Sequence, residues 1–142
     1  MKKVGVLFLG IISLSILVGC GNTKTLTCTQ TSEEGLEGKV VIKFKDEKIV
    51  SGEQTMKMIL PEGSEEYFDT LKEALNSSTE SLKDIEGIEV NSQDNGKNEA
   101  EVSVSFDYDK LNDYAKDELS LSDADSYDEL KTNFEDLGFI CE

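Results

Sequence analysis

The chain has 142 residues, and its 14 basic residues, all lysine, are outnumbered by 30 aspartates and glutamates, so the formal net charge is −16. Such a charge repels nucleic acid and anionic lipid head groups, so we expect no nucleic-acid partner, and cationic proteins, peptides or metal ions are favoured instead. The same charge would also simply keep a secreted domain soluble.

The first part of the chain is an apolar leader. Lys2 and Lys3 precede an uncharged stretch over residues 4–18. This stretch is shorter than the roughly 20 residues that a membrane-spanning helix needs. A positive start followed by a short apolar run is typical of a secretory signal.

The end of the leader resembles the bacterial lipobox, the signal at which lipoprotein precursors are modified and cut. Its residues are Leu17, Val18, Gly19 and Cys20. We therefore predict that residues 1–19 form a signal peptide that is removed, and that Cys20 becomes the lipidated first residue of the mature protein. A signal anchor with an incidental cysteine is the alternative.

A diacylated, palmitate-bearing cysteine would hold the protein on the cell membrane, facing the extracytoplasmic side, because two acyl chains anchor stably where one does not. The mature chain carries 12 lysines against 30 acidic residues, a formal charge near −18. With a lipid anchor, no basic patch is needed for membrane attachment. We expect a short tether over residues 20–23 and one domain over residues 24–142.

The first half of this domain predicts strands and a helix. We expect strands over 24–30, 40–45 and 49–60, with turns at 32–37 and 46–47 and a hairpin between the second and third strands. Pro61 to Gly63 would end the third strand, and Ser64 would cap a helix. The apolar residues of that helix recur at helical spacing and should form its buried stripe: Tyr67, Phe68, Leu71, Ala74 and Leu75.

The second half has the clearest strand signal. Ile88 and Val90 start a strand, residues 94–96 form a turn, and apolar residues then alternate with polar ones from 99 to 108. The apolar set is Ala100, Val102, Val104, Phe106 and Tyr108. Such alternation is typical of a sheet with one buried face.

Two helices and a last strand complete the expected elements. A short helix is expected over 111–119, and the capping-box spacing from Ser126 to Glu129 opens another. The inner face of this second helix would be Tyr127, Leu130, Phe134 and Leu137. Gly138 would end it, and residues 139–141 would form the last strand. The fold class is α+β, an antiparallel β-sheet with two or three helices packed on one face.

Cys28 and Cys141 remain as a pair once Cys20 is assigned to lipid. In an exported protein we predict a disulfide between them that ties the first strand to the last. A redox pair would need two neighbouring cysteines, and metal binding by two lone thiols without histidine is a poor alternative.

The sequence offers little for catalysis. Histidine is absent, and so are the glycine motifs that bind phosphate. A hydrolase with paired carboxylates stays open, yet such sites sit in grooves lined with aromatic rings, which this sequence uses in its leader and core. We therefore expect a protein that is not an enzyme and has no cofactor.

Two acidic clusters are candidates for weak cation binding only. Asp107 and Asp109 start an EF-hand-like spacing that fails where Leu111 and Asn112 stand. Asp123 and Asp125 form the second cluster. Acidic residues are favourable just before the N-terminus of a helix, and this explains the cluster better than cation binding does. We predict no specific metal site.

The mature chain, together with its lipobox, resembles the YehR-like family of small bacterial lipoproteins. The resemblance is carried by three segments: Leu26-Thr27-Cys28-Thr29, Ile42-Lys43-Phe44-Lys45 and the ending Gly138-Phe139-Ile140-Cys141. Phe106-Asp107-Tyr108-Asp109 is similar as well. The resemblance implies a compact α+β domain on a lipid anchor, with no assigned biochemical activity and no catalytic or ligand residues.

From these features we expect a monomeric, lipid-anchored, non-enzymatic envelope protein that acts by binding a partner. The alternative is an inhibitor or sequestering protein for a cationic hydrolase or antimicrobial peptide, which the acidity favours. A third reading, an accessory solute-binding protein, would need an enclosed pocket, for which a domain of this size has little apolar sequence to spare.

Overall fold

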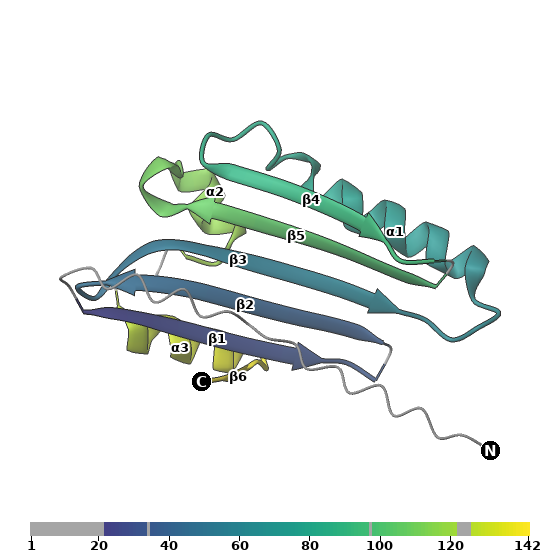
Figure 1. Ribbon diagram of the computed structural model, residues 1–142, viewed down its shortest axis with the longest axis horizontal. Helices are drawn as coiled ribbons and strands as arrows, with labels where there is room; N and C mark the ends of the chain where they lie inside the picture. The colour runs from purple at the N-terminus through teal and green to yellow at the C-terminus, as the bar shows by residue number, and fades with distance from the viewer. Residues whose placement is uncertain (1–21, 34, 97, 122–125) are drawn as a thin grey trace, which may run out of the picture.

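The computed structural model describes residues 22–33, 35–96, 98–121 and 126–142. Within these residues it is an α+β fold, in which six antiparallel strands form one sheet in the order β4-β5-β3-β2-β1-β6. The strands are β1 (Thr23–Thr31), β2 (Leu36–Lys45), β3 (Lys48–Ile59), β4 (Ile88–Asp94), β5 (Glu99–Asp107) and β6 (Ile140–Cys141). The helices are α1 (Glu65–Glu80), α2 (Asp113–Glu118) and α3 (Tyr127–Asp136), with a 3₁₀ turn over Tyr108–Lys110. The helices lie on one face of the sheet (Figure 1), as the sequence predicts.

The sheet has a buried face toward the helices and a solvated outer face, because successive side chains of a strand point to opposite sides. In β5 the apolar residues Ala100, Val102, Val104 and Phe106 are buried, and the alternating polar residues are half-exposed. This confirms the strongest strand prediction. The register aligns the residues of neighbouring strands that face the helices in rows across the sheet, such as Val40, Gln54 and Val104.

Strands β2 and β3 form the predicted hairpin. Asp46 and Glu47 make its turn and both have positive φ, 50° and 66°, as a two-residue hairpin turn with the twist of the strands requires. The Asp46 amide donates a hydrogen bond of 3.0 Å to the carbonyl of Asn22, so the chain entering β1 is fixed beside this turn.

Helix α1 begins directly after Ser64, as predicted, but its buried stripe is narrower than predicted. Phe68 is buried, whereas Tyr67 is 59% exposed and Ala74 is also exposed. Placing these two residues in the core was wrong, because α1 lies mainly against β5 and leaves part of the sheet uncovered beside it. Ser64 occupies the N-cap position, but its side chain makes no capping hydrogen bond.

Helices α2 and α3 both begin at side-chain caps. Asn112 Oδ1 accepts a hydrogen bond of 2.8 Å from the Ala115 amide, and Ser126 Oγ accepts one of 3.3 Å from the Glu129 amide, as the capping-box spacing predicts.

The end of α3 differs from the predicted inner face. Leu137 is 57% exposed, so its placement in the core was wrong. Gly138 turns the chain with φ of 91°, and Phe139 instead packs its ring edge against Phe134, at 5.5 Å between centroids.

The buried residues form two clusters rather than one core. The larger lies between the sheet and helices α2 and α3 and includes Ile42, Phe44 and Leu130. The smaller lies between the first half of α1 and the far ends of β3 and β5, and consists of Met58, Leu60, Phe68 and Ala100.

A candidate binding groove

A half-open groove on the helix-covered face of the sheet has a volume of about 290 Å³. We call this site the groove. Its floor consists of side chains from three adjacent strands: Val40 of β2, Gln54 and Met56 of β3, and Val102 and Val104 of β5. The strand register places these residues in two rows on the same face, which explains why they converge.

The walls of the groove come from helical segments and from the chain before β6. Leu75 and Thr79 of α1, with Leu82 just beyond it, form one wall. Leu119 at the end of α2 and Phe139 before β6 form the other. The two longer helices pack on different parts of this face (Figure 1): α1 packs mainly on β5, while α3 packs on β1 and β6.

The polar group in the floor is fixed rather than free to rotate. Gln54 Nε2 donates a hydrogen bond of 2.8 Å to the carbonyl oxygen of Leu119. This bond joins the middle strand of the floor to the wall at α2. Because the amide is half-buried and already paired, it gives the groove a defined shape.

Met56 is the most exposed residue of the floor. It points to the helix-covered face, yet 46% of its surface is accessible. An unbranched thioether side chain in an open apolar site adapts its shape to different partners. The groove volume lies at the lower end of the range for small-molecule sites, so the groove fits one or two apolar side chains of a partner better than an enclosed ligand.

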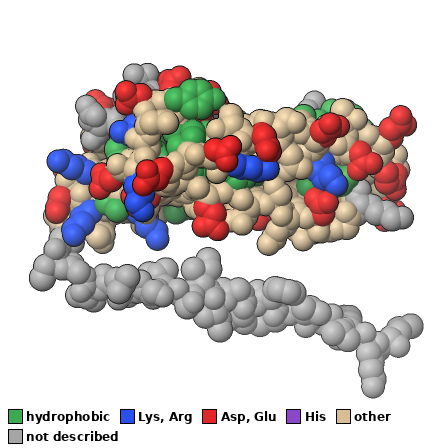
Figure 2. Space-filling model, turned by 90° about the horizontal axis from the view of Figure 1, so that it is seen from above, with side chains coloured by type: hydrophobic (Ala, Val, Ile, Leu, Met, Phe, Trp, Pro, Cys, Tyr) green, Lys and Arg blue, Asp and Glu red, His purple; other side chains and the backbone are tan. Residues whose placement is uncertain are grey.

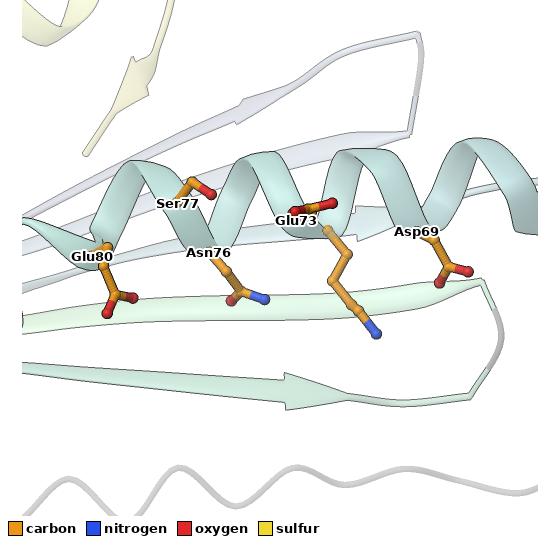
Figure 3. Close-up of a pocket in the computed structure, with 6 residues that line it drawn as sticks. Asp69, Glu73, Asn76, Ser77 and Glu80 are labelled. Carbon is orange, nitrogen blue, oxygen red and sulfur yellow. The ribbon is translucent and has the colours of Figure 1, made fainter.

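A second hollow lies along the other side of α1 and is polar. Lys72 Nζ lies 2.9 Å from Asp94 Oδ2, and Ser92 Oγ donates a hydrogen bond of 3.0 Å to Asn76 Oδ1, so both contacts fasten α1 to β4. The ion pair raises the pKa of Lys72 above its ordinary value, chiefly through its hydrogen bond to Asp94. Figure 3 shows Asp69 and Glu80 projecting on the same side of the helix as Asn76, in an open acidic surface.

The predicted disulfide is present. Cys28 of β1 and Cys141 of β6 are bonded, with their Cα atoms paired in the sheet register. Two backbone hydrogen bonds between Thr27 and Glu142, of 2.8 and 3.1 Å, flank the bond. The lipobox residues Leu17, Val18, Gly19 and Cys20 lie outside the described residues.

The acidic candidates do not form a metal centre in the described part of the chain. Asp107 ends β5 and pairs with Lys110 at 3.1 Å, while Asp109 is exposed in the following 3₁₀ turn. Asp123 and Asp125 lie outside the described residues. Among the residues that the structure describes, no group of three or more histidine, cysteine, aspartate or glutamate side chains could hold a metal ion.

Across those same residues, the structure contains no helix with the length and apolar character needed to span a bilayer.

The groove is the feature that the sequence reasoning missed. The hairpin register aligns Gly38 with Met56 and Val40 with Gln54 on the face toward the helices. A glycine and an amide among core-facing positions were the available signal, because neither fills space as a branched apolar side chain does.

Fold and site together define a class: a small α+β domain whose six-stranded antiparallel sheet carries helices on one face and a partly open apolar groove between them. No protein-family model matches the chain, and no curated protein matches it by sequence.

Two solved structures share the fold. The NMR structure of the Escherichia coli YehR protein has a TM-score of 0.66 and 14% sequence identity, over 87% of this chain and 93% of that one. The NMR structure of a protein from Streptococcus pneumoniae TIGR4 has a TM-score of 0.57 and 15% identity, over 100% of this chain and 98% of that one. The resemblance to the YehR-like family is thereby confirmed at the level of the fold.

Proposed function

We propose that this chain is a lipid-anchored, non-enzymatic lipoprotein of the cell envelope, which faces the extracytoplasmic side of the membrane and binds a partner through the groove. The observation that carries the proposal is the lipobox ending at Cys20. It stands directly before a folded domain whose first strand begins at Thr23.

A disulfide between the first and last strands supports an exported location. Cys28 and Cys141 would be kept reduced in most cytosolic compartments, whereas extracytoplasmic proteins retain such bonds. Because these two cysteines bond to each other, the disulfide does not need Cys20, the third cysteine of the sequence, which is consistent with the proposed lipid attachment there.

The composition of the groove supports binding rather than catalysis. Its floor is built from valine, methionine and a glutamine that already donates to Leu119. The two ionisable residues of its lining, Lys39 and Glu118, are both exposed, whereas acid–base catalysis relies on ionisable groups held against a substrate. A mostly apolar, partly open surface with one fixed amide suits the side chains of a partner protein or peptide.

Metabolic labelling with a palmitate analogue tests the anchor. The wild-type chain should be labelled and should fractionate with membranes, whereas Cys20→Ala should be neither labelled nor processed. The double variant Cys28→Ala/Cys141→Ala is the matched control, because it removes two cysteines but keeps the proposed attachment site. Label that persists in Cys20→Ala would contradict the proposal.

Site-specific photo-crosslinking in intact cells tests the groove. A photoreactive residue at Met56, which is 46% exposed in the groove, should capture a defined partner. The control position is Val50, which has similar exposure in the same strand but does not line the groove. Equal capture at both positions would argue against the groove as the binding surface.

The charge of the domain favours a second candidate, an inhibitor or sequestering protein for a cationic hydrolase or antimicrobial peptide. The end of the sheet formed by the β1–β2 turn and the start of α1 carries a dense group of exposed carboxylates: Glu33, Glu37, Glu62, Glu65 and Glu66. Such a surface would attract a cationic partner from solution.

Affinity for basic proteins at rising salt separates the two candidates. An inhibitor should bind its target tightly at about 0.15 M salt, where the screening length is near 8 Å. Binding that is micromolar or weaker and is lost at that salt concentration would remove the second candidate and leave the first unaffected.

A further inference from the structure

We propose that one corner of the sheet is the membrane-facing surface of the domain and that its lysines contact the phosphates of anionic lipid head groups. We call this surface the lysine corner and define it by Lys24, Lys43, Lys45 and Lys48. The inference rests on the proposed lipid attachment at Cys20 and adds to it an orientation and a lipid class.

The strand register brings the four lysines together. Lys45 pairs with Thr23 of β1 on one side and with Lys48 of β3 on the other, so these positions form the last rung of three adjacent strands. Lys24 follows on the next rung, and Lys43 lies one rung further, opposite Thr25. Lys43, Lys45 and Lys48 share the outer face of the sheet, opposite the buried Phe44 and Ile49, and Lys24 lies on the helix side.

These lysines are available for a partner. None of the four takes part in an ion pair within the described residues, and the Lys24 ammonium lies 5.6 Å from the ring centroid of Tyr127. Lys57 and Lys72 differ, because they pair at 2.9 Å with Glu99 and Asp94 toward the opposite end of the sheet. Of the six described lysines that take part in no ion pair, four therefore lie where the chain enters the fold, and the other two are Lys39 and Lys116.

The covalent distance to the anchor is very short. Asn22 is held against the β2–β3 turn by the hydrogen bond from Asp46, and Cys20 lies only two residues before it. With consecutive Cα atoms 3.8 Å apart, Cys20 lies within about 8 Å of Asn22. A lipid on Cys20 would therefore bring the lysine corner to within about one screening length of the head groups.

The acidic groups near the corner limit the contact to the outer face of β1, β2 and β3. Asp46 and Glu47 lie in the turn itself and offset part of the positive charge. Asp107 pairs with Lys110 at the corresponding end of β5, where Asp109 also lies, and Asp128 and Glu129 begin α3 on the helix side. The domain should therefore tilt onto its β1–β3 corner rather than stand squarely on the end of the sheet.

Much of the remaining negative charge lies at the opposite end of the sheet, around Glu37, Glu62 and Glu65. Figure 2 shows lysine side chains gathered toward one end of the molecule and acidic side chains prevailing at the other. A strand of 12 residues such as β3 spans roughly 40 Å. Charges at that distance are several screening lengths from the head groups and oppose the contact very little. The net negative charge repels the domain as a whole from an anionic membrane, but the lysine corner itself is attracted to it.

Lysine footprinting of the full-length lipidated protein tests the proposal. The protein is reconstituted in vesicles of phosphatidylglycerol and phosphatidylcholine, or of phosphatidylcholine alone, and the acylation rate of each lysine is followed by mass spectrometry. Lys43, Lys45 and Lys48 should react about fivefold more slowly in the anionic vesicles, as expected for roughly 1 kcal/mol of attraction per lysine. The difference should vanish at about 1 M salt, where the screening length is near 3 Å. Lys57 and Lys72 should react at the same rate in both.

Two variants separate the corner from overall charge. In Lys43→Gln/Lys45→Gln, Lys48 should lose its lipid-dependent protection. The matched control, Lys57→Gln/Lys72→Gln, removes the same charge at surface ion pairs that contribute little stability. In this control the protection of Lys48 should remain.

The outcomes distinguish the two proposals. A protein that carries the lipid and floats with the vesicles, yet has equal lysine reactivity in both lipids, overturns the lysine corner and leaves the anchor intact. A protein that carries no lipid on Cys20 and does not float overturns both. Protection of Lys48 that is lost equally in the two double variants also overturns the corner, because it would then follow net charge alone.

Discussion

Removing the Cys28–Cys141 disulfide should destabilise the fold strongly. The bond joins residues 113 positions apart. In the chain-entropy model, closing a loop of that length stabilises the folded state by about 4.8 kcal/mol at 25 °C. Domains of this size have a net stability of only about 5–15 kcal/mol, so the loss is a large share of the total.

The local structure indicates where the reduced protein should open first. Strand β6 has only two residues, Ile140 and Cys141, and pairs with β1 alone. Besides the disulfide, the hydrogen bonds between Thr27 and Glu142 hold it in place. Without the bond, β6 should fray, and the amide of Glu142 should lose its protection from hydrogen exchange while the β3–β5 amides keep theirs.

Urea unfolding of the double variant Cys28→Ala/Cys141→Ala, with and without reductant, measures the effect. Thermal unfolding gives a second measurement. For roughly 120 residues the unfolding entropy is about 0.25 kcal/mol/K, so a loss of 4.8 kcal/mol corresponds to a fall in Tm of about 19 °C. Reductant should shift the wild type toward the variant and should leave the variant unchanged. A wild type that loses less than about 1 kcal/mol on reduction would refute the chain-entropy reasoning for this fold.

The remaining predictions concern packing and one ion pair. Phe106→Ala should cost about 3–5 kcal/mol in urea unfolding, because its ring is buried in the larger cluster; an unchanged midpoint would contradict that placement. Gly52→Ala should cost about 1–3 kcal/mol in the same assay, because a Cβ there would lie 2.6 Å from the Phe106 ring and 2.7 Å from the Val41 carbonyl oxygen. The hydrogen bond from Lys57 lowers the pKa of Glu99, so this pair stabilises the fold above the unfolded pKa of Glu99, and that contribution is lost as the pH falls through the folded value. Lys57→Met should raise the pKa of Glu99 in an NMR titration of its carboxyl carbon; an unmoved pKa would show that the pair does not persist in solution.

The elements of the fold could be predicted because their signals are local. The alternation in β5 and the capping box at Ser126 both depend on residues within one turn or one strand, and the structure contains both. The disulfide could be predicted by counting cysteines: if Cys20 is assigned to lipid, as we propose, Cys28 and Cys141 remain as a pair.

The coverage of the sheet could not be predicted, because it depends on where the helices lie. Helical spacing marked Tyr67 and Leu137 as core residues, but spacing shows only which side of a helix is apolar. It does not show whether the sheet extends beneath that side. Helix α1 leaves a strip of the sheet open, and the exposed surface of Met56 and the groove follow from that offset.

The distribution of charge over the surface was the least predictable property, since a net charge does not say where the charged residues lie. The strand pairing decides that Lys43, Lys45 and Lys48 meet at one corner, while other lysines are neutralised by ion pairs elsewhere. A membrane surface interacts with charges within about one screening length of it, near 8 Å at physiological salt. A domain that carries about −18 as a whole can therefore present a positive surface to an anionic membrane, provided that its attachment point lies at the positive corner. Asn22 is fixed at that corner by its hydrogen bond with Asp46. The position of the anchor relative to the strands, rather than the composition, is what would decide how this domain sits on a bilayer.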